Sequence, residues 1–271
     1  MPIKDVTDTS LADLASLDGR VAVVTGAAMG IGRAISRRLA EAGATVVAAD
    51  IDADALEATV ASIAQTGGTI EGAAVDVCDT TSIDRLVDDT VAKHGRLDIM
   101  VNNAGIYPNQ PVLEMDDASW DRVMELNVRG AFAGSRAAAR HMIPQGDGGV
   151  IITLGSVNGY RAFGGGLSHY TASKHAIHGL TRALAVELGP HDIRVVAVAP
   201  TMIETEGVGA LREVMGENEF GAQMATMASL HPAGRVGVPD DIARVVAFLV
   251  SDAAAMVNGT SVDVDGGYLS A

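Results

Sequence analysis

The feature that most constrains the fold is a glycine-rich turn near the N-terminus. Four apolar residues, Val21 to Val24, predict a short buried strand. A turn of sequence Thr-Gly-Ala-Ala-Met-Gly-Ile-Gly follows over residues 25–32, and helical spacing then runs from Arg33 to Ala42 before Gly43. This order places backbone N–H groups and a positive helix end where a phosphate can bind. The alternative is a tight turn that holds no ligand.

A second apolar run, residues 45–49, ends in Asp50. Its distance from the glycine turn matches the ~20 residues that bring an acidic side chain to the ribose of a dinucleotide. A carboxylate there accepts hydrogen bonds from the ribose hydroxyls and repels the extra phosphate of NADP. Neither Met29 nor Ile51 supplies a positive charge for that phosphate, so the sequence predicts NAD. A strand-end or helix-capping role for Asp50 is the other interpretation.

Strands and helices alternate along the rest of the chain. Apolar runs predict one strand that ends near Asp76 and further strands over residues 97–101, 150–154, 194–199 and 261–264. Predicted helices cover about residues 54–64, 82–94, 116–141 and 170–188, and Pro144 follows the end of the third. A last helix is predicted to start at Pro239. Such alternation implies parallel pairing with right-handed crossovers. We predict an α/β fold, a Rossmann-type doubly wound seven-stranded parallel sheet with helices on both faces.

Tyr170 and Lys174 lie four residues apart, so on a helix they share one face. A free tyrosine titrates near ~10, and a neighbouring ammonium stabilises its anion. A phenol tuned in this way can exchange a proton with an alcohol or a carbonyl oxygen, which is general acid/base chemistry. Taken alone, the pair is also typical of a solvated helix surface.

Two further polar residues stand at informative positions. Ser156 follows the predicted strand 150–154, where its hydroxyl can bond a substrate oxygen or form a turn. Asn127 lies inside a predicted helix, a position that asparagine disfavours because its side chain competes with the backbone. A functional role and an exposed, backbone-bonded amide are both compatible with that position.

Composition limits the partners. The net charge of −15 argues against nucleic acid and anionic membranes, which repel an acidic surface. The single cysteine, Cys78, cannot form an intrachain disulfide, and no Cys/His cluster has zinc-ligand spacing. No signal peptide or membrane-spanning run is present. The sequence therefore predicts a cytoplasmic protein that acts on a small molecule without a metal.

In combination, the motifs resemble the short-chain dehydrogenase/reductase family in its single-domain form, from about Gly19 to Gly267. The motifs occur in the family's order: the 25–32 turn, Asp76-Val77, Asn102-Asn103-Ala104-Gly105, Asn127, Ser156, Tyr170-x-x-x-Lys174, Pro200 and Val264-Asp265-Gly266-Gly267. The resemblance implies interconversion of a secondary alcohol and a ketone by hydride transfer.

The resemblance also implies roles for individual residues. Tyr170 is the expected acid/base, Ser156 the substrate-oxygen ligand, Lys174 the group that lowers the phenol pKa, and Asn127 part of a water relay. The expected cofactor-binding residues are Gly26, Met29, Gly30, Ile31, Gly32, Asp50, Ile51, Asp76, Val77, Asn103, Ala104, Gly105, Tyr170, Lys174, Pro200, Ile203 and Thr205. The expected substrate-pocket residues are Ser156, Tyr107, Val157, Tyr160, Phe163, His169 and Met202.

The chain departs from the family pattern at two places. Thr201 replaces the glycine after Pro200, and Gly155 replaces a common serine. Two other functions stay open: a catalytically silent dinucleotide-binding regulatory protein, and an NADP-dependent ketoacyl reductase. Asp50 and the acidic charge argue against the second, and the presence of Ser156, Tyr170 and Lys174 argues against the first.

We divide the chain into an N-terminal extension, residues 1–18, and a single Rossmann-fold catalytic domain, residues 19–271. Within the domain, the glycine- and Met-containing insertion around residues 202–230 is predicted to form a substrate loop. The family resemblance further implies a homotetramer in which the Asn127 and Tyr170 helices pair between subunits.

Overall fold

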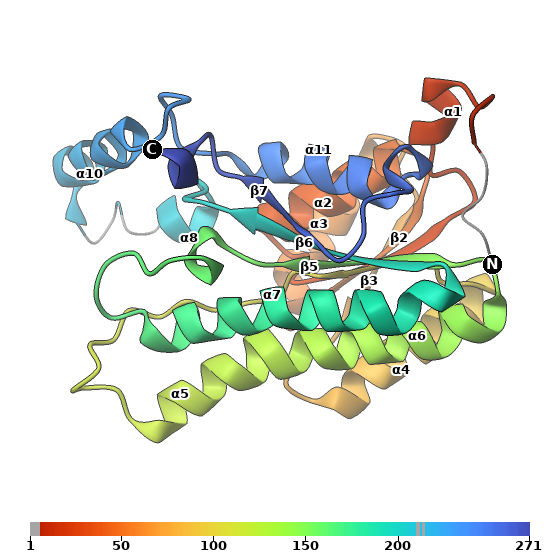
Figure 1. Cartoon of the computed structure of the whole chain (residues 1–271), viewed down its shortest axis with the longest axis horizontal. Helices are drawn as coiled ribbons and strands as arrows, with labels where there is room; N and C mark the ends of the chain where they lie inside the picture. The colour runs from red at the N-terminus through yellow and green to blue at the C-terminus, as the bar shows by residue number, and fades with distance from the viewer. Residues whose placement is uncertain (1–5, 210–211, 213–214) are drawn as a thin grey trace.

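A computed structural model describes residues 6–209, 212 and 215–271. Seven parallel strands form one sheet in the order β3-β2-β1-β4-β5-β6-β7 (Figure 1). The predicted sheet is confirmed, and its strands are β1 (Val21–Thr25), β2 (Thr45–Asp50), β3 (Ile70–Ala74), β4 (Ile99–Asn102), β5 (Gly149–Leu154), β6 (Ile193–Pro200) and β7 (Ser261–Val264).

The strand order reverses direction at β1. The chain moves outward from β1 to β2 and β3, then crosses to β4 on the other side of β1. Ligands of open parallel sheets bind at the carboxyl ends of the strands beside such a reversal. The glycine turn after β1 and the asparagine turn after β4 both lie there.

Helices cover both faces of the sheet (Figure 1). One face carries α2 (Gly30–Glu41), α3 (Ala53–Gln65) and α11 (Pro239–Val250), and the other carries α4 (Thr80–His94), α6 (Ala131–Gln145) and α7 (Ser168–Leu188). Side chains alternate between the faces, so Val24 of β1 joins one core and Val23 the other. The sheet is therefore buried on both sides.

A long helical stretch precedes β5. It consists of α5 (Asp117–Met124), a π-helical turn over Glu125–Gly130, and α6. The prediction that Pro144 follows the helix was wrong, because Pro144 lies inside the last turn of α6. Tyr170 lies in the first turn of α7, since the helix begins two residues earlier at Ser168.

The segment before β1 packs against the domain. A short helix, α1 (Leu11–Ala15), is followed by Leu17, which is fully buried in the core. The Leu17 N–H donates to the carbonyl oxygen of Ala42 at 2.8 Å. The last residues of the predicted extension thus contribute to the hydrophobic core.

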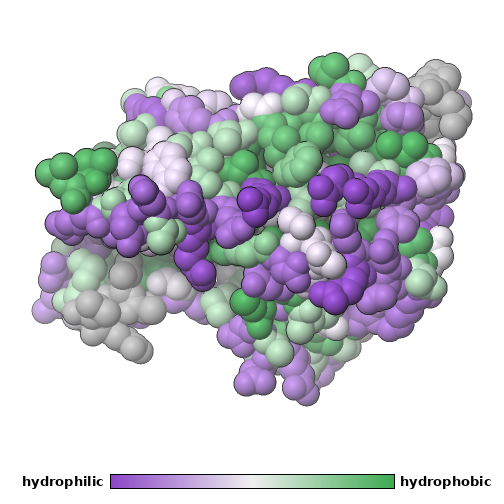
Figure 2. Space-filling model, turned by 90° about the horizontal axis from the view of Figure 1, so that it is seen from below, coloured by the Kyte–Doolittle hydropathy of each residue, from purple (hydrophilic) through white to green (hydrophobic). Residues whose placement is uncertain are grey.

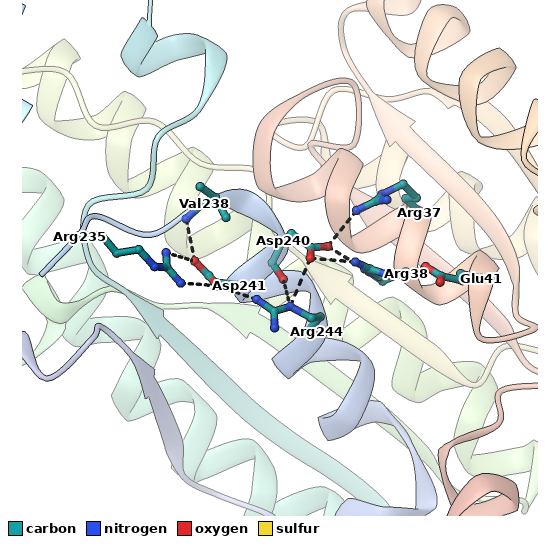
Figure 3. A network of polar contacts seen from close by, with 8 residues as sticks. All are labelled: Arg37, Arg38, Glu41, Arg235, Val238, Asp240, Asp241 and Arg244. Atoms are coloured by element: carbon teal, nitrogen blue, oxygen red, sulfur yellow. Dashed lines mark hydrogen bonds and ion pairs between the residues drawn. The ribbon is translucent and has the colours of Figure 1, made fainter. Parts of the chain in front are cut away.

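A cluster of ion pairs joins α11 to α2 (Figure 3). The Arg38 guanidinium donates to both oxygens of Asp240, at 2.7 and 2.8 Å, and Arg37 donates to the same carboxylate. Asp241 pairs with Arg235 and Arg244, and the hydrogen bond from Arg235 is the main reason that the pKa of Asp241 falls to about 2. Bidentate arginine contacts fix geometry more strongly than isolated surface pairs do, so they orient α11 on the sheet.

The outer surface of the α4–α7 layer is mixed in character. Figure 2 shows hydrophilic and hydrophobic residues interleaved on this face. Exposed apolar side chains include Trp120 on α5, Phe132 on α6 and Val186 on α7. Within the described ranges, none of the helices is long and apolar enough to cross a membrane.

Candidate active site

The glycine turn and the asparagine turn are joined by hydrogen bonds. The Asn103 side-chain amide donates to the carbonyl oxygens of Thr25 and Gly26, both at 2.9 Å. The Thr25 hydroxyl accepts from the Asn103 backbone N–H at 3.1 Å. Gly26 has φ of +64°, and an added Cβ would lie 2.8 Å from the Ala104 Cα. Only glycine permits this approach, so the two turns form one rigid surface beside α2.

The start of α2 carries a carboxylate that the sequence analysis did not identify. Glu206, from α8 (Glu206–Gly209), accepts a hydrogen bond from the Gly30 N–H at 3.0 Å and pairs with Arg33. Burial raises the pKa of Glu206, but backbone hydrogen bonds and the Arg33 charge outweigh it and hold the pKa below its usual range. The neighbouring Thr205 methyl lies 3.4 Å from where a Gly30 Cβ would be. An anionic group therefore occupies the positive end of α2.

The predicted ribose and adenine ligands lie on two adjacent loops. Asp50, at the end of β2, accepts from the Ala28 N–H at 2.9 Å and from the Asp52 N–H at 3.1 Å. Asp76 follows the neighbouring strand β3, is exposed and accepts from the Cys78 N–H. Ile51 is exposed, and Val77 packs against Gly130. The structure thus brings these four side chains to one edge of the sheet.

Ser156, Tyr170 and Lys174 come together beyond the end of β5. The Lys174 ammonium donates to the carbonyl oxygen of Leu154 at 2.7 Å, and its Nζ lies 5.6 Å from the centroid of the Tyr170 ring. Ser156 is buried, its Oγ accepts from the Asn158 N–H at 3.1 Å, and its side chain is hydrogen-bonded to Tyr170. The three predicted catalytic side chains therefore form one cluster.

Burial controls the titration of this cluster. It raises the pKa of Tyr170, and the hydrogen bond with Ser156 lowers that pKa by a smaller amount. It also lowers the pKa of Lys174 from 10.5 to about 8. Lys174 is not among the causes of the shift in the Tyr170 pKa in this structure, so the expectation that it lowers the phenol pKa stays a prediction.

Asn127 lies in the π-helical turn and connects three elements. Its side-chain amide donates to the Ile106 carbonyl at 2.9 Å and to the Ser173 hydroxyl at 3.1 Å, and its Oδ1 accepts from the Ile106 N–H at 2.9 Å. A Cβ on Gly105 would lie 3.4 Å from this oxygen and 3.9 Å from the Lys174 Nζ. Asn127 therefore holds the asparagine turn against α7, beside the buried ammonium.

An aromatic stack forms a wall near the substrate-pocket residues. Phe163 lies 4.7 Å, between ring centroids, from Tyr268 in the C-terminal turn Tyr268–Ser270, and Tyr268 stacks on His231 at 4.9 Å. His231 is hydrogen-bonded to the Thr201 hydroxyl at 3.0 Å. The Tyr107 ring meets Tyr170 edge-on at 6.0 Å. The sequence analysis missed Tyr268 and His231, although Tyr268 directly follows the Asp265-Gly266-Gly267 motif.

Two of the predicted substrate-pocket residues, Tyr160 and His169, have other contacts. The Tyr160 ring packs edge-on against His178 at 4.5 Å, and its hydroxyl is hydrogen-bonded to Asp263 and Ser261 of β7. His169 is fully buried, and its Nδ1 accepts from the Tyr170 N–H at 2.8 Å. Tyr160 is thus an exposed side chain that contacts α7 and β7, and His169 is buried in the first turn of α7; among the residues described, no contact joins either side chain to Ser156.

The departure at Gly155 has a steric reason. A Cβ at Gly155 would lie 2.9 Å from the His178 Nε2. Neither ring nitrogen of the buried His178 has a hydrogen-bond partner among the described residues, and burial lowers its pKa to about 4. A neutral imidazole thus fills the space that a side chain at Gly155 would need.

The segment after β6 contains two predicted site residues, Met202 and Ile203, and the predicted substrate loop. Ile203 is buried and bridges to Gly237, whereas Met202 is only partly buried. Part of the predicted substrate loop is helical, as α8 and α10 (Glu217–Ser229), while residues 210, 211, 213 and 214 lie outside the described residues. In Figure 1, α8, α10 and the C-terminus gather at the same end of the molecule.

The chain resembles characterised oxidoreductases over most of its length. Residues 26–269 match a family model described as enoyl-(acyl carrier protein) reductase. A 3beta-hydroxysteroid dehydrogenase 2 of Eggerthella lenta is 40% identical over 254 residues, which cover 93% of this chain and 95% of the relative. A cis-4-hydroxycyclohexanecarboxylate dehydrogenase of Sinomonas cyclohexanicum is 41% identical over 251 residues, 92% of this chain and 96% of the relative.

Solved structures of similar proteins have the same fold. A short-chain type dehydrogenase/reductase from Mycobacterium marinum has a TM-score of 0.89 and 38% identity, covering 96% of this chain and 99% of that one. A gluconate 5-dehydrogenase from Burkholderia cenocepacia, in complex with NADP and tartrate, has a TM-score of 0.87 and 33% identity, covering 97% and 100%.

Proposed function

Because this chain belongs to the short-chain dehydrogenase/reductase family, we propose that it is an NAD(H)-dependent enzyme that interconverts a secondary alcohol and a ketone. The family consists of oxidoreductases that use a nicotinamide dinucleotide. The observation that carries the finer proposal is the cluster beyond β5, where the Tyr170 phenol is hydrogen-bonded to Ser156 beside a buried ammonium.

In this proposal Tyr170 exchanges the proton. During oxidation the phenolate oxygen takes the hydroxyl proton of the alcohol, and Ser156 holds the same oxygen by a hydrogen bond. When bound, the cofactor supplies the hydride acceptor, and the positive charge of its oxidised ring favours the phenolate. Lys174 adds a second positive charge while it stays protonated, and Asn127 keeps the surrounding turns in place.

The residues of the chain fit a dinucleotide. The glycine turn offers backbone N–H groups at the start of α2, where Glu206 already binds as an anion. Asp50 supports NAD over NADP, because its carboxylate faces the turn and no described Lys or Arg forms an ion pair with it. The NADP bound to the Burkholderia cenocepacia relative makes the preference a question for experiment.

The alternative functions have less support in the sequence and the structure. The matching family model is described as an enoyl reductase, but enoyl reductases of this fold usually have more than the three residues that separate Tyr170 from Lys174 here. The regulatory alternative requires no catalytic cluster, although the chain has one. A ketoacyl reductase remains within the same chemistry and differs in cofactor and substrate.

A steady-state screen tests the proposal. Secondary alcohols, ketones and a β-ketoacyl thioester are assayed with NAD(H) and NADP(H) by nicotinamide absorbance. Turnover of alcohols or ketones that is faster with NAD(H) is the expected result. Cofactor binding without turnover across the panel would favour the regulatory protein, and turnover of the thioester with NADPH alone would favour the ketoacyl reductase.

We also propose a homotetramer. The exposed apolar side chains of Trp120, Phe132 and Val186 lie on α5, α6 and α7, the helices expected to pair between subunits. Light scattering coupled to size-exclusion chromatography measures the oligomeric state directly, and a monomeric mass would exclude the tetramer.

A further inference from the structure

Arg161 has no acidic partner, although the protein carries a net charge of −15. Among the residues described, no carboxylate forms an ion pair with it, whereas Arg33, Arg38 and Arg244 all do. Arg161 is exposed and lies in the loop between Ser156 and Tyr170. An unpaired cation at this place is available to an anion from outside the protein.

Two aromatic rings hold its guanidinium. The Arg161 Cζ lies 4.8 Å from the centroid of the Phe163 ring and 5.5 Å from that of the Tyr268 ring. Stacking on ring faces uses the flat side of the guanidinium and leaves its N–H donors at the edge free. The group is therefore oriented in advance without losing its capacity for hydrogen bonding.

Hydrogen bonds connect the Arg161 loop to the catalytic serine. The Phe163 N–H donates to the Asn158 Oδ1 at 3.2 Å, and the Asn158 N–H donates to the Ser156 Oγ at 3.1 Å. The Arg161 N–H donates to the carbonyl oxygen of Val157 at 3.3 Å. The loop thus folds back on itself directly after Ser156, and Arg161 lies in this folded segment, five residues after the catalytic serine.

The same stack reaches the end of β6. Tyr268 stacks on His231, and His231 is hydrogen-bonded to Thr201, next to Pro200. The wall of Phe163, Tyr268 and His231 therefore spans the ends of two neighbouring strands, and Arg161 forms its exposed end. A substrate bound along this wall with its oxygen at Ser156 extends its other end toward Arg161.

We infer that Arg161 binds a carboxylate of the substrate, so that the enzyme acts on hydroxy acids and keto acids. A carboxylate matches the planar donor edge of arginine in a bidentate contact. In this inference Ser156 binds the oxygen at one end of the substrate and Arg161 the acid at the other, so the acid and the carbinol are separated by several bonds. The inference rests on the proposed function and adds the substrate class to it.

Binding measurements test the inference without requiring turnover. The probes are 4-hydroxycyclohexanecarboxylate and 5-hydroxyhexanoate, each compared with its neutral carboxamide, in calorimetric titrations of the full chain with NADH present. We expect the wild type to prefer the acids, and Arg161→Gln to weaken acid binding by ~10- to 100-fold, the scale of a lost charge-assisted hydrogen bond, with the amides unchanged. Arg161→Lys keeps the charge and should fall between the two.

The control is Arg140→Gln, which removes the same charge from an arginine whose side chain is 59% exposed on α6. This variant should bind acid and amide as the wild type does. Equal binding of acid and amide by the wild type, no measurable acid binding, or an equal loss of both in Arg161→Gln overturns the inference. Carboxylate preference without turnover would instead contradict the proposed function, and turnover of neutral alcohols without carboxylate preference would contradict this inference alone.

Discussion

The Glu206 carboxylate accepts a hydrogen bond from the Gly30 N–H at 3.0 Å, at the first residue of α2. A dinucleotide phosphate needs N–H groups at such a positive helix end. Arg33, on the first turn of α2, pairs with the same carboxylate. If the proposed cofactor phosphate binds at Gly30, it competes with Glu206 for one position, and its binding requires the start of α8 to move the carboxylate away.

Glu206→Gln should therefore bind NAD more tightly than the wild type. The neutral amide is a weaker competitor for the Gly30 N–H and releases Arg33, so we expect a ~3- to 10-fold lower dissociation constant, on the scale of one hydrogen bond. Calorimetric titration with NAD measures it. Glu204→Gln is the control, because Glu204 lies two residues away and only approaches Arg212, at 3.9 Å. Unchanged or weaker binding by Glu206→Gln would show that the carboxylate does not compete.

Tyr170→Phe should retain cofactor binding and lose turnover by more than ~100-fold, the usual scale for loss of a general acid or base. The variant removes only the oxygen that is hydrogen-bonded to Ser156, and the ring keeps its edge-on contact with Tyr107. Steady-state rates and NADH titration on the same samples separate chemistry from folding. Turnover near the wild-type rate would remove Tyr170 from the acid/base role.

The buried ammonium of Lys174 should make stability depend on pH. Burial lowers its pKa from 10.5 to about 8, so between these values the unfolded chain binds more protons than the folded one. The free energy of unfolding therefore rises with pH through this range. Below about pH 8 the folded protein bears the full cost of burying the Lys174 charge. Lys174→Met lacks this group, so its stability relative to the wild type should fall by about 2 kcal/mol from pH 7 to 9.5.

Urea unfolding of wild type and Lys174→Met at both pH values measures that difference. The methionine also leaves the Leu154 carbonyl without its 2.7 Å donor, which costs the same at each pH. The comparison across pH therefore isolates the titration. An equal stability difference at the two pH values would mean that the folded and unfolded chains protonate Lys174 alike.

Local patterns were sufficient to predict the sheet, because its central strands are short apolar runs buried on both faces, such as Val21–Thr25. They also placed the turns that follow the strands, since glycine and asparagine mark those positions directly. Helix ends were less predictable. Pro144 sits in the last turn of α6, and Leu17 is buried because it packs into the core with residues far along the chain.

The parts of the site that sequence reasoning missed depend on contacts between distant residues. Tyr268 packs at a tilted angle against Phe163, which lies more than a hundred residues earlier, and Glu206 meets Gly30 across 176 residues. No spacing rule connects such pairs. The contacts of Tyr160 with His178 and of His169 with the Tyr170 N–H could not be predicted for the same reason.

Gly155 gives a steric prediction that the sequence alone could not supply. In Gly155→Ala the new methyl would lie 2.9 Å from the His178 Nε2, too close for contact without movement. We expect a loss of about 1 to 3 kcal/mol in the free energy of unfolding, typical of overpacking. In a His178→Ala background the same change should cost little, which a double-mutant cycle in urea detects. Additive effects would show that the ring does not restrict this position.

Asp50 should determine the choice between NAD and NADP. Its carboxylate also accepts the Ala28 N–H at 2.9 Å and the Asp52 N–H at 3.1 Å, so Asp50→Ala removes support from the glycine turn as well as negative charge. Asp50→Asn keeps one acceptor oxygen for the turn and removes the charge that repels the extra phosphate of NADP. If the carboxylate selects the cofactor, both variants should lower the ratio of kcat/KM for NAD to that for NADP, while Asp50→Ala alone weakens binding of both cofactors. An unchanged ratio in Asp50→Asn would mean that the selectivity comes from another part of the site.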